Sequence, residues 1–177
     1  IIVRNNKEKA ALIRSAQTDA LTGVYNKENT QNMIDEILRK KDPDSFHGFL
    51  ILDMDHFKEV NDVYGHAMGD KVLEMLGNFL KKQFREQDVI GRIGGDEFVI
   101  LLYNIGSRQN MENRVKSLQE KIREIHMDGM EGHTVTLSAG IAFAPQDGDT
   151  FMELYQKADL ALYQVKRSGR NGYRIYK

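Results

Sequence analysis

The stretch that decides the fold is Arg92-Ile93-Gly94-Gly95-Asp96-Glu97-Phe98-Val99-Ile100-Leu101-Leu102. Gly-Gly between two strand-like apolar runs, 89–93 and 98–102, predicts a β-hairpin. We expect the glycines to permit positive φ angles and to let a ligand approach the backbone. Burying Asp96 and Glu97 beside a hydrophobic sheet is costly unless a cation or a hydrogen-bond donor compensates them. Taken alone, the motif fits a hairpin without chemistry equally well.

A second pair of acids, Asp53 and Asp55, follows the apolar run 49–52. This pattern is typical of a buried strand whose end emerges at the edge of a sheet. The two acids share a face if the strand continues through both, because side chains alternate. Such carboxylates suit Mg²⁺, and together with the hairpin acids they could form a two-metal site for phosphoryl or nucleotidyl transfer. The alternative, solvated acids that cap a strand, fits one of the two acids better than all four.

Composition sets the class of protein. A chain of 177 residues with 41% hydrophobic and 29% charged residues fits one soluble domain with a sizeable core. The formal net charge of −1 creates no general attraction for nucleic acid or membranes. The absence of cysteine excludes disulfides and fits a cytoplasmic location. Neither a signal peptide nor an apolar run near the roughly 18 residues of a membrane span is visible. Because the chain begins at Ile1, we expect a fragment of a longer protein, whose upstream part would carry any membrane anchor.

Apolar spacing predicts the remaining elements. Residues 1–18 are mostly charged and predict an exposed connector helix, and residues 19–177 form the folded domain. Helices are expected around 33–38, 72–84, 111–125 and 151–165, and strands over 49–55, 89–93, 98–102, 133–144 and 173–176. The alternation in 133–144 predicts a half-buried strand. Gly77, inside a predicted helix, suggests close packing. The predicted fold class is α/β (α+β), with helices on each side of a mixed sheet.

Several spaced motifs together resemble the GGDEF domain, the catalytic module of diguanylate cyclases, whose fold is similar to the palm of nucleotidyl cyclases and polymerases. The resemblance runs from about Asp19 to Asn171. It departs from the family at Val24, where leucine is frequent, and at Lys27, where arginine is usual, and neither is a catalytic position. The matching motifs are Asp19-Ala20-Leu21-Thr22-Gly23, Asp53-Met54-Asp55-His56-Phe57-Lys58, Asn61-Asp62-Val63-Tyr64-Gly65-His66, Gly69-Asp70, Gly94-Gly95-Asp96-Glu97-Phe98, Ala158-Asp159-Leu160-Ala161-Leu162-Tyr163, Lys166 and Gly169-Arg170-Asn171.

The resemblance implies that two GTP molecules condense to cyclic di-GMP and two pyrophosphates. Each 3′-hydroxyl attacks the α-phosphorus of the other nucleotide across a two-fold homodimer. Asp53, the Met54 carbonyl and Asp96 would bind Mg²⁺ or Mn²⁺. Asp96 would also help to deprotonate the hydroxyl, with Glu97 as a further acid. Which of Asp96 and Glu97 contacts the metal directly stays open.

Further residues acquire roles from the same resemblance. Lys58 would contact the triphosphate. Lys166 and Arg170, four positions apart and hence on one helical face, would clamp phosphates; otherwise they are an ordinary basic helix end. Asn61 and Asp70 would read guanine, with His66 lining the pocket. The competing explanation for Asn61-Asp62 and Gly69-Asp70 is that they form turns.

Arg85 and Asp88 have the Arg-x-x-Asp pattern of the inhibitory product site of the family. The resemblance therefore implies feedback inhibition by cyclic di-GMP, and a helix-end ion pair is the ordinary alternative. We expect an active cyclase whose excised domain is largely monomeric. The alternatives are a silent receptor for cyclic di-GMP or GTP and an interaction domain that works through its connector helix.

Overall fold

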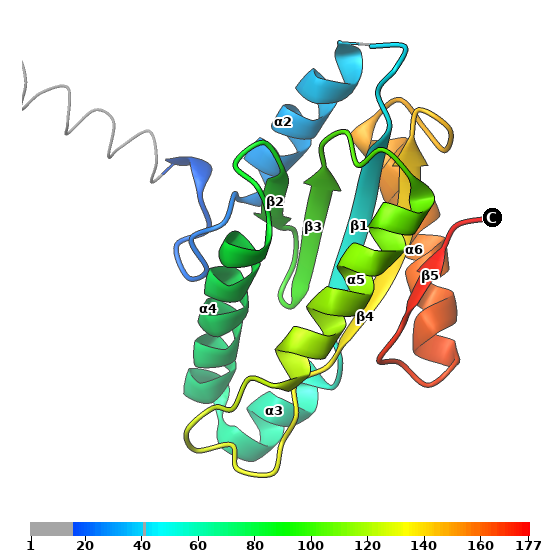
Figure 1. The fold of residues 1–177 in the computed structure, drawn as a ribbon. Helices are drawn as coiled ribbons and strands as arrows, with labels where there is room; N and C mark the ends of the chain where they lie inside the picture. The colour runs from blue at the N-terminus through cyan, green and yellow to red at the C-terminus, as the bar shows by residue number, and fades with distance from the viewer. Residues whose placement is uncertain (1–15, 41) are drawn as a thin grey trace, which may run out of the picture.

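The chain builds a five-stranded mixed sheet with the strand order β2-β3-β1-β4-β5 (Figure 1). The computed structural model describes residues 16–40 and 42–177, so nearly all of the expected connector helix 1–18 lies outside the described residues. The central strand β1 (His47–Met54) pairs antiparallel with β3 (Glu97–Leu102) and β4 (Leu137–Ala144). β2 (Val89–Arg92) pairs antiparallel with β3, and β5 (Tyr173–Ile175) runs parallel to β4. The mixed sheet and the hairpin are as predicted.

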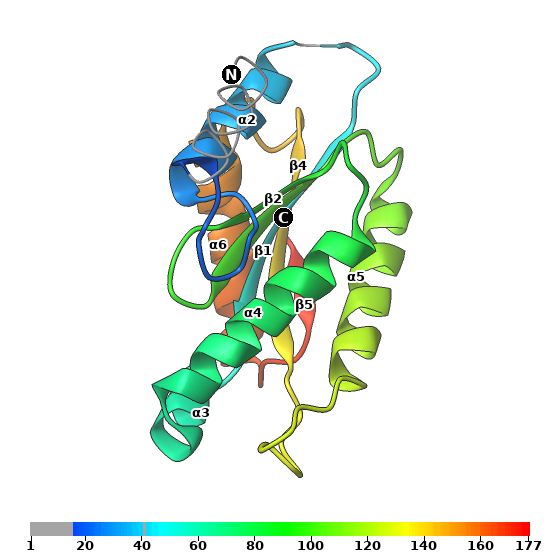
Figure 2. The same ribbon diagram turned by 90° about the vertical axis from the view of Figure 1, so that its left-hand side faces the viewer.

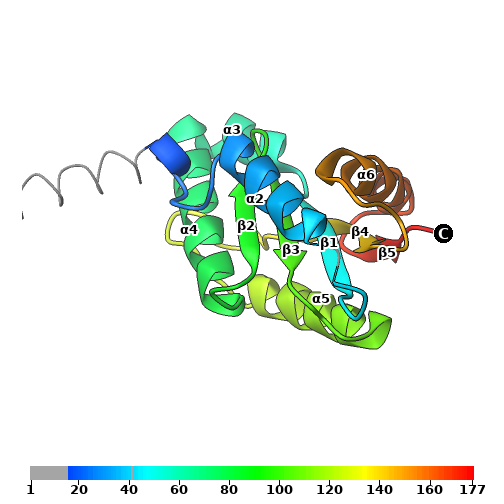
Figure 3. The same cartoon turned by 90° about the horizontal axis from the view of Figure 1, so that it is seen from above.

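Helices cover both faces of the sheet, as expected. α2 (Lys27–Arg39) and α6 (Phe151–Arg167) lie on one face, and α4 (His66–Gln83) and α5 (Arg108–Arg123) lie on the other (Figures 2 and 3). The short helix α3 (Phe57–Tyr64) follows β1 at the end of the sheet where the β2–β3 turn also lies (Figure 1). Among the residues that the structure describes, none of the helices combines the length and the apolar character needed to cross a membrane.

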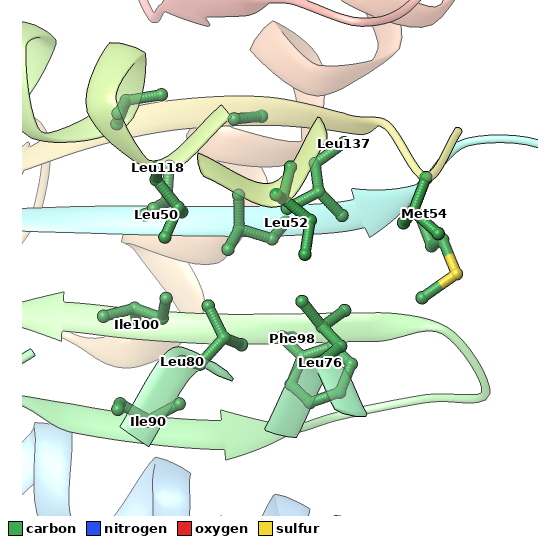
Figure 4. Packing of buried hydrophobic residues seen from close by; sticks show 14 of the residues in the cluster. Leu50, Leu52, Met54, Leu76, Leu80, Ile90, Phe98, Ile100, Leu118 and Leu137 are labelled. Carbon is green, nitrogen blue, oxygen red and sulfur yellow. The ribbon is translucent and has the colours of Figure 1, made fainter. Parts of the chain in front are cut away.

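The alternation of side chains along β1 divides the core into two layers. Leu50, Leu52 and Met54 belong to the cluster between the sheet and α4 and α5 (Figure 4). Phe49 and Ile51 point the other way, into the cluster formed with α2 and α6. Because both faces are covered, the strand reads as a continuous apolar run in the sequence.

Several predictions about secondary structure were wrong. The half-buried strand over 133–144 starts only at Leu137, because its pairing partner β1 ends at Met54, and all its residues are buried because helices cover both faces. Helix α3 was not predicted, and α4 begins at His66, six residues before the predicted start of that helix. Asn61 and Asp62 lie inside α3, and Gly69 and Asp70 lie in α4, so neither pair forms a turn.

Two glycines permit contacts on which the packing depends. A Cβ atom on Gly77 of α4 would lie 2.5 Å from the carbonyl oxygen of Thr22, which confirms the expected close packing. A Cβ atom on Gly140 of β4 would lie 2.0 Å from the carbonyl oxygen of Ala158 in α6. Glycine at 140 therefore lets α6 lie directly against the sheet.

Candidate active site

Three acids gather where β1 ends and the β2–β3 turn begins. Asp53 pairs with Glu97 in the register of β1 and β3. The backbone N–H of Met54 donates to the carbonyl oxygen of Asp96 at 3.4 Å, which ties the turn to the end of β1. A pocket of about 280 Å³ opens at this point, lined by Asp53, Met54, His56, Phe57, Lys58, Glu59, Asp96, Lys166 and Arg170.

Asp53 is largely enclosed in this pocket and has a cationic partner. Its side chain is 14% exposed, and its Oδ2 lies 2.9 Å from Nζ of Lys166. Burial raises the pKa of Asp53, with further increases from Asp96 and Glu97, against the lowering effect of Lys166. Burial and the neighbouring carboxylates thus disfavour the ionised form of Asp53, and a cation added beside Asp53 would favour it.

Glu97 is held by a residue that sequence reasoning missed. The hydroxyl of Tyr155, on α6, donates to Glu97 Oε1 at 2.6 Å. Burial, followed by the bond to Glu97, raises the pKa of Tyr155 far above its usual value, so the hydroxyl keeps its proton. The two residues are 58 positions apart, and no pattern in the sequence points to the contact.

The turn between β2 and β3 is held by Arg92. Its guanidinium donates to the carbonyl oxygens of Gly94 and Gly95 and, at 3.1 Å, to Asp19 Oδ1. Neither glycine has a positive φ, so that prediction was wrong, and the Arg92 side chain secures the turn instead. A Cβ on Gly95 would meet nothing within 4 Å, so the backbone there is open to a ligand. The role of Arg92 was missed, although Asp19 belongs to a recognised motif.

Asp55 has a different environment from Asp53. It is buried, and its carboxylate accepts hydrogen bonds from the hydroxyls of Thr136 and Ser138 and from the backbone N–H of Asn171. These bonds tie the residue that follows β1 to the start of β4 and to the loop after α6. Asp55 is therefore a buried structural acid and not the solvated strand cap considered from the sequence.

The start of α3 faces the same pocket. The residue before the helix, His56, has φ 58°, and no side chain caps the first turn. His56 Nδ1 lies 2.7 Å from Glu59 Oε1. The uncapped N–H groups of a helix N-terminus attract anions such as phosphate. Lys58, in the first turn, lines the pocket with them.

Lys166 and Arg170 both line the pocket, but they do not share a helical face as predicted. Lys166 is in the last turn of α6, whereas Arg170 follows the helix in a left-handed conformation with φ 64°. The helix ends at Arg167, before Arg170 is reached, and the loop returns the second cation to the site.

The three residues expected to read guanine lie beyond this pocket, on α3 and α4. A Cβ on Gly69 would lie 1.9 Å from Asn61 Oδ1, so Asn61 contacts α4 one residue before the exposed Asp70. His66 is exposed at the first position of α4. Asn61 and Asp70 thus come from neighbouring turns of two packed helices, as a shared binding surface requires.

Arg85 and Asp88 lie apart from the acids, in the loop between α4 and β2. Asp88 accepts hydrogen bonds from the backbone N–H groups of Arg85 and Tyr103, each at 2.9 Å. The Asp88 carboxylate thus bonds the backbone of Arg85, and the predicted alternative of a helix-end ion pair does not describe this loop. Both residues line a separate pocket of about 530 Å³ beside residues 17–25.

The donor atoms of the acidic pocket fit a hard divalent cation that is shared with a substrate. Within residues 16–40 and 42–177, no group of three or more acidic or histidine side chains is arranged to hold a metal ion by itself. Mg²⁺, however, is usually held by one or two carboxylates together with substrate phosphates and water. Asp53, Met54 and Asp96 all line the pocket, and the two carboxylates supply such a partial set.

Known proteins resemble this chain over most of its length. A family model described as "Diguanylate cyclase, GGDEF domain" matches residues 16–172. The diguanylate cyclase TpbB of Pseudomonas aeruginosa is 35% identical over 179 residues, which cover 97% of this chain and 40% of TpbB.

Two solved structures extend the comparison to the fold. The coiled coil and GGDEF domain of DgcB from Caulobacter crescentus, in complex with c-di-GMP, is 23% identical with a TM-score of 0.86, covering 99% of this chain and 92% of that one. A microbial GGDEF domain described in its interaction with cyclic di-GMP is 31% identical with a TM-score of 0.77, covering 93% of this chain and 98% of that one. The family model and the identity to TpbB together show that the chain belongs to the GGDEF domain family.

Proposed function

We propose that residues 19–177 form a diguanylate cyclase domain that condenses two GTP molecules into cyclic di-GMP and two pyrophosphates. The observation that carries the proposal is the convergence of Asp53, Asp96 and Glu97 beside Lys166 and the uncapped start of α3. Acids suited to bind a cation thereby lie close to N–H and ammonium groups suited to bind phosphate. That combination suits nucleotidyl transfer, in which charge on transferring phosphates must be neutralised.

The proposed metal ligands are the carboxylates of Asp53 and Asp96 and the carbonyl of Met54, for Mg²⁺ or Mn²⁺. A bound divalent cation would lower the pKa of the attacking hydroxyl and neutralise phosphate charge. Asp96 and Glu97 provide the carboxylate oxygens that can accept the proton from the 3′-hydroxyl. Both are partly exposed at the end of the sheet, where a ribose can approach them.

Cationic groups around the pocket would bind the triphosphate. Lys58 and the N–H groups of α3 approach from one side, and Lys166 and Arg170 approach from the end of α6. Lys166 is paired with Asp53 in this structure, at 2.9 Å. A phosphate oxygen would compete with Asp53 for the ammonium group of Lys166. Asp53 would then be free to bind a divalent cation. Lys166 would then move from the carboxylate to the phosphate when the metal–nucleotide complex binds.

The guanine base would be recognised by residues of α3 and α4. A carboxylate at Asp70 accepts hydrogen bonds from N1–H and N2–H₂ of guanine, which adenine cannot donate in that pattern, and Asn61 and His66 would complete the surface. Buried polar groups left without partners penalise the wrong base. We therefore expect GTP on both sides of the reaction and cyclic di-GMP, not the mixed guanine–adenine product, from a GTP and ATP mixture.

Catalysis would require two copies of the domain. The product contains two nucleotides joined by two equivalent bonds, and each copy of the chain contributes one Asp53 and one Asp96. Two identical sites that face each other across a two-fold axis satisfy this requirement with one chain type. Residues 1–18 would serve as the connector helix that brings protomers together, although so short a helix dimerises weakly alone. The excised domain should therefore be mostly monomeric and gain specific activity with concentration.

Product would also bind at Arg85 and Asp88, as an inhibitory site. The microbial GGDEF domain mentioned above is described in its interaction with cyclic di-GMP, and it covers almost the same length of chain. Arg85 is exposed and borders three pockets, so its guanidinium can meet a guanine base. Asp88 already accepts two backbone N–H bonds, which hold the loop ready for such a ligand.

Incubation of the protein with Mg²⁺ and GTP, followed by chromatographic detection of cyclic di-GMP, tests the function. Cyclic di-GMP whose rate per protomer rises with protein concentration supports the cyclase. Binding of cyclic di-GMP or GTP without turnover, at concentrations that give dimers, would instead identify a silent receptor. Neither binding nor turnover would leave an interaction domain.

A further inference from the structure

Tyr155 approaches the acidic cluster from the middle of α6. Its hydroxyl donates to Glu97 Oε1 at 2.6 Å, yet Tyr155 is not among the residues that line the 280 Å³ pocket. Glu97 does not line that pocket either, but it adjoins the pocket through Asp53, its partner across the sheet, and Asp96, its neighbour in the chain. Tyr155 therefore holds one oxygen of Glu97 from the side of α6. Tyr155 belongs to none of the motifs that define the resemblance to the family.

The position of the Tyr155 ring is fixed by a column of aromatic side chains. The ring is stacked on Phe151 of the same helix, with a centroid distance of 5.7 Å and an interplanar angle of 22°. Phe151 in turn meets Phe49 of β1 edge to face at 5.6 Å. Phe49 and Phe151 are buried, so the hydroxyl is carried on a rigid support that begins in the central strand.

The same helix supplies a partner to each of two neighbouring carboxylates. Tyr155 and Lys166 are eleven positions apart, which is about three helical turns and places them on one face. Lys166 contacts Asp53, and Tyr155 contacts Glu97, the residue paired with Asp53 across the sheet. Like charges directly opposite each other on neighbouring strands repel. A neutral hydroxyl restrains Glu97 against this repulsion and leaves its charge in place.

We propose that Tyr155 is a positioning residue, which occupies Oε1 of Glu97 and thereby keeps this carboxylate beside Asp53, where its charge would support a divalent cation held by Asp53 and Asp96 and its Oε2 would face the ribose hydroxyl of GTP. This inference rests on the proposed function of the pocket. Without the hydroxyl, Glu97 would rotate toward solvent, away from Asp53 and Asp96. The metal–nucleotide complex would then lose one oriented carboxylate, while the fold would keep the aromatic column.

The test compares Tyr155→Phe with the matched control Tyr163→Phe, which removes an exposed hydroxyl from the same helix. The affinity for Mn²⁺ is measured by electron paramagnetic resonance, with a GTP analogue whose α,β-methylene bridge prevents pyrophosphate release. We expect about tenfold weaker Mn²⁺ binding in Tyr155→Phe, the size of one hydrogen bond to a charged group. Tyr163→Phe should bind like the parent protein, and both variants should keep the parent's melting temperature.

A double-mutant comparison separates positioning from a general effect on structure. In the Glu97→Gln background, Tyr155→Phe should change Mn²⁺ affinity by less than about twofold, since the group it acts through has lost its charge. Parent-like affinity in Tyr155→Phe, or an equal loss with and without Glu97, would overturn the inference. A parent protein that binds Mn²⁺ with the analogue but makes no cyclic di-GMP from GTP would reject the proposed function alone.

Discussion

Asp53 and Asp55 lie two positions apart in the chain, and their surroundings assign them opposite tasks. Asp53 faces one lysine and two other acids at a pocket, and burial together with those acids raises its pKa. Asp55 is buried and accepts hydrogen bonds from three neutral donors, which engage both of its carboxylate oxygens. A charged group with too few partners is available to a ligand, whereas one with a complete set of partners stabilises the fold. Identical side chains in one motif therefore divide into a reactive acid and a structural one.

Removing the charges of the pocket tests the different roles of Asp53 and Asp55 most strongly. Asp53→Asn and Asp96→Asn should each lower cyclic di-GMP formation at least about 10³-fold, because a lost carboxylate ligand removes several kcal/mol of charge stabilisation. Asp53→Asn should leave the free energy of unfolding within about 1 kcal/mol, or raise it, since its raised pKa shows that the ionised form is disfavoured in the folded state. Product assays and urea unfolding provide the two readouts. Full activity in either variant would refute the assignment.

Removal of the lysine should have the next largest effect. Lys166→Met leaves Asp53 without its ion-pair partner and removes a proposed phosphate contact, so activity should fall about 10²-fold, mainly as a higher KM for GTP. Arg167→Met is the matched control, because Arg167 is exposed and its guanidinium lies over the ring of Tyr163, 5.8 Å from the centroid. Steady-state kinetics at varied GTP distinguish the two variants. An equal loss in both would mean that general charge at the end of α6, and not contact with Asp53, supports activity.

Substitution of Asp55 should lower stability more than activity, the opposite of what is expected for Asp53. Asp55→Asn replaces an acceptor of three hydrogen bonds by a group that also donates, so unfolding free energy should fall by about 2–4 kcal/mol. The rate per folded molecule should fall less than tenfold. Ser138→Ala removes one of the donors and should cost about 1–2 kcal/mol. Unfolding curves with parent-like stability for Asp55→Asn would contradict its structural role.

His47, at the other end of β1, should have a smaller effect, on the pH dependence of stability. Burial lowers the pKa of His47 from 6.5, against the raising effect of Asp42, and His47 Nδ1 accepts the backbone N–H of Asn104. For a base with a lowered folded pKa, the unfolded state binds more protons below pH 6.5. Stability should therefore fall as the pH drops below that value, by at most about 1.4 kcal/mol per pH unit.

His47→Asn keeps an acceptor for Asn104 but cannot take up a proton. The difference in unfolding free energy between the parent and His47→Asn should therefore move in the variant's favour from pH 7.5 to pH 5. A difference that is independent of pH would show that His47 does not titrate differently in the two states.

The sequence was sufficient to predict the layers of the fold but not its short elements. Long apolar repeats predicted the hairpin and the helices on each face, whereas α3 was missed because Val60 is its single buried residue and leaves no periodic signal. Most of the residues that line the pocket were predicted from the spaced motifs. The roles of Tyr155 and Arg92 could not be predicted, since their partners Glu97 and Asp19 lie 58 and 73 positions away. Only the packing of α6 brings Tyr155 to Glu97, and only the packing of the segment before α2 brings Asp19 to Arg92.

One measurement tests the central claim most directly. Parent protein, Asp53→Asn and Asp55→Asn are incubated with Mg²⁺ and GTP at a concentration that gives dimers, and cyclic di-GMP is quantified per folded molecule. The account predicts product from the parent, product within tenfold of the parent from Asp55→Asn, and none above background from Asp53→Asn. Equal losses in the two variants, or product from Asp53→Asn at the rate of the parent, would contradict it.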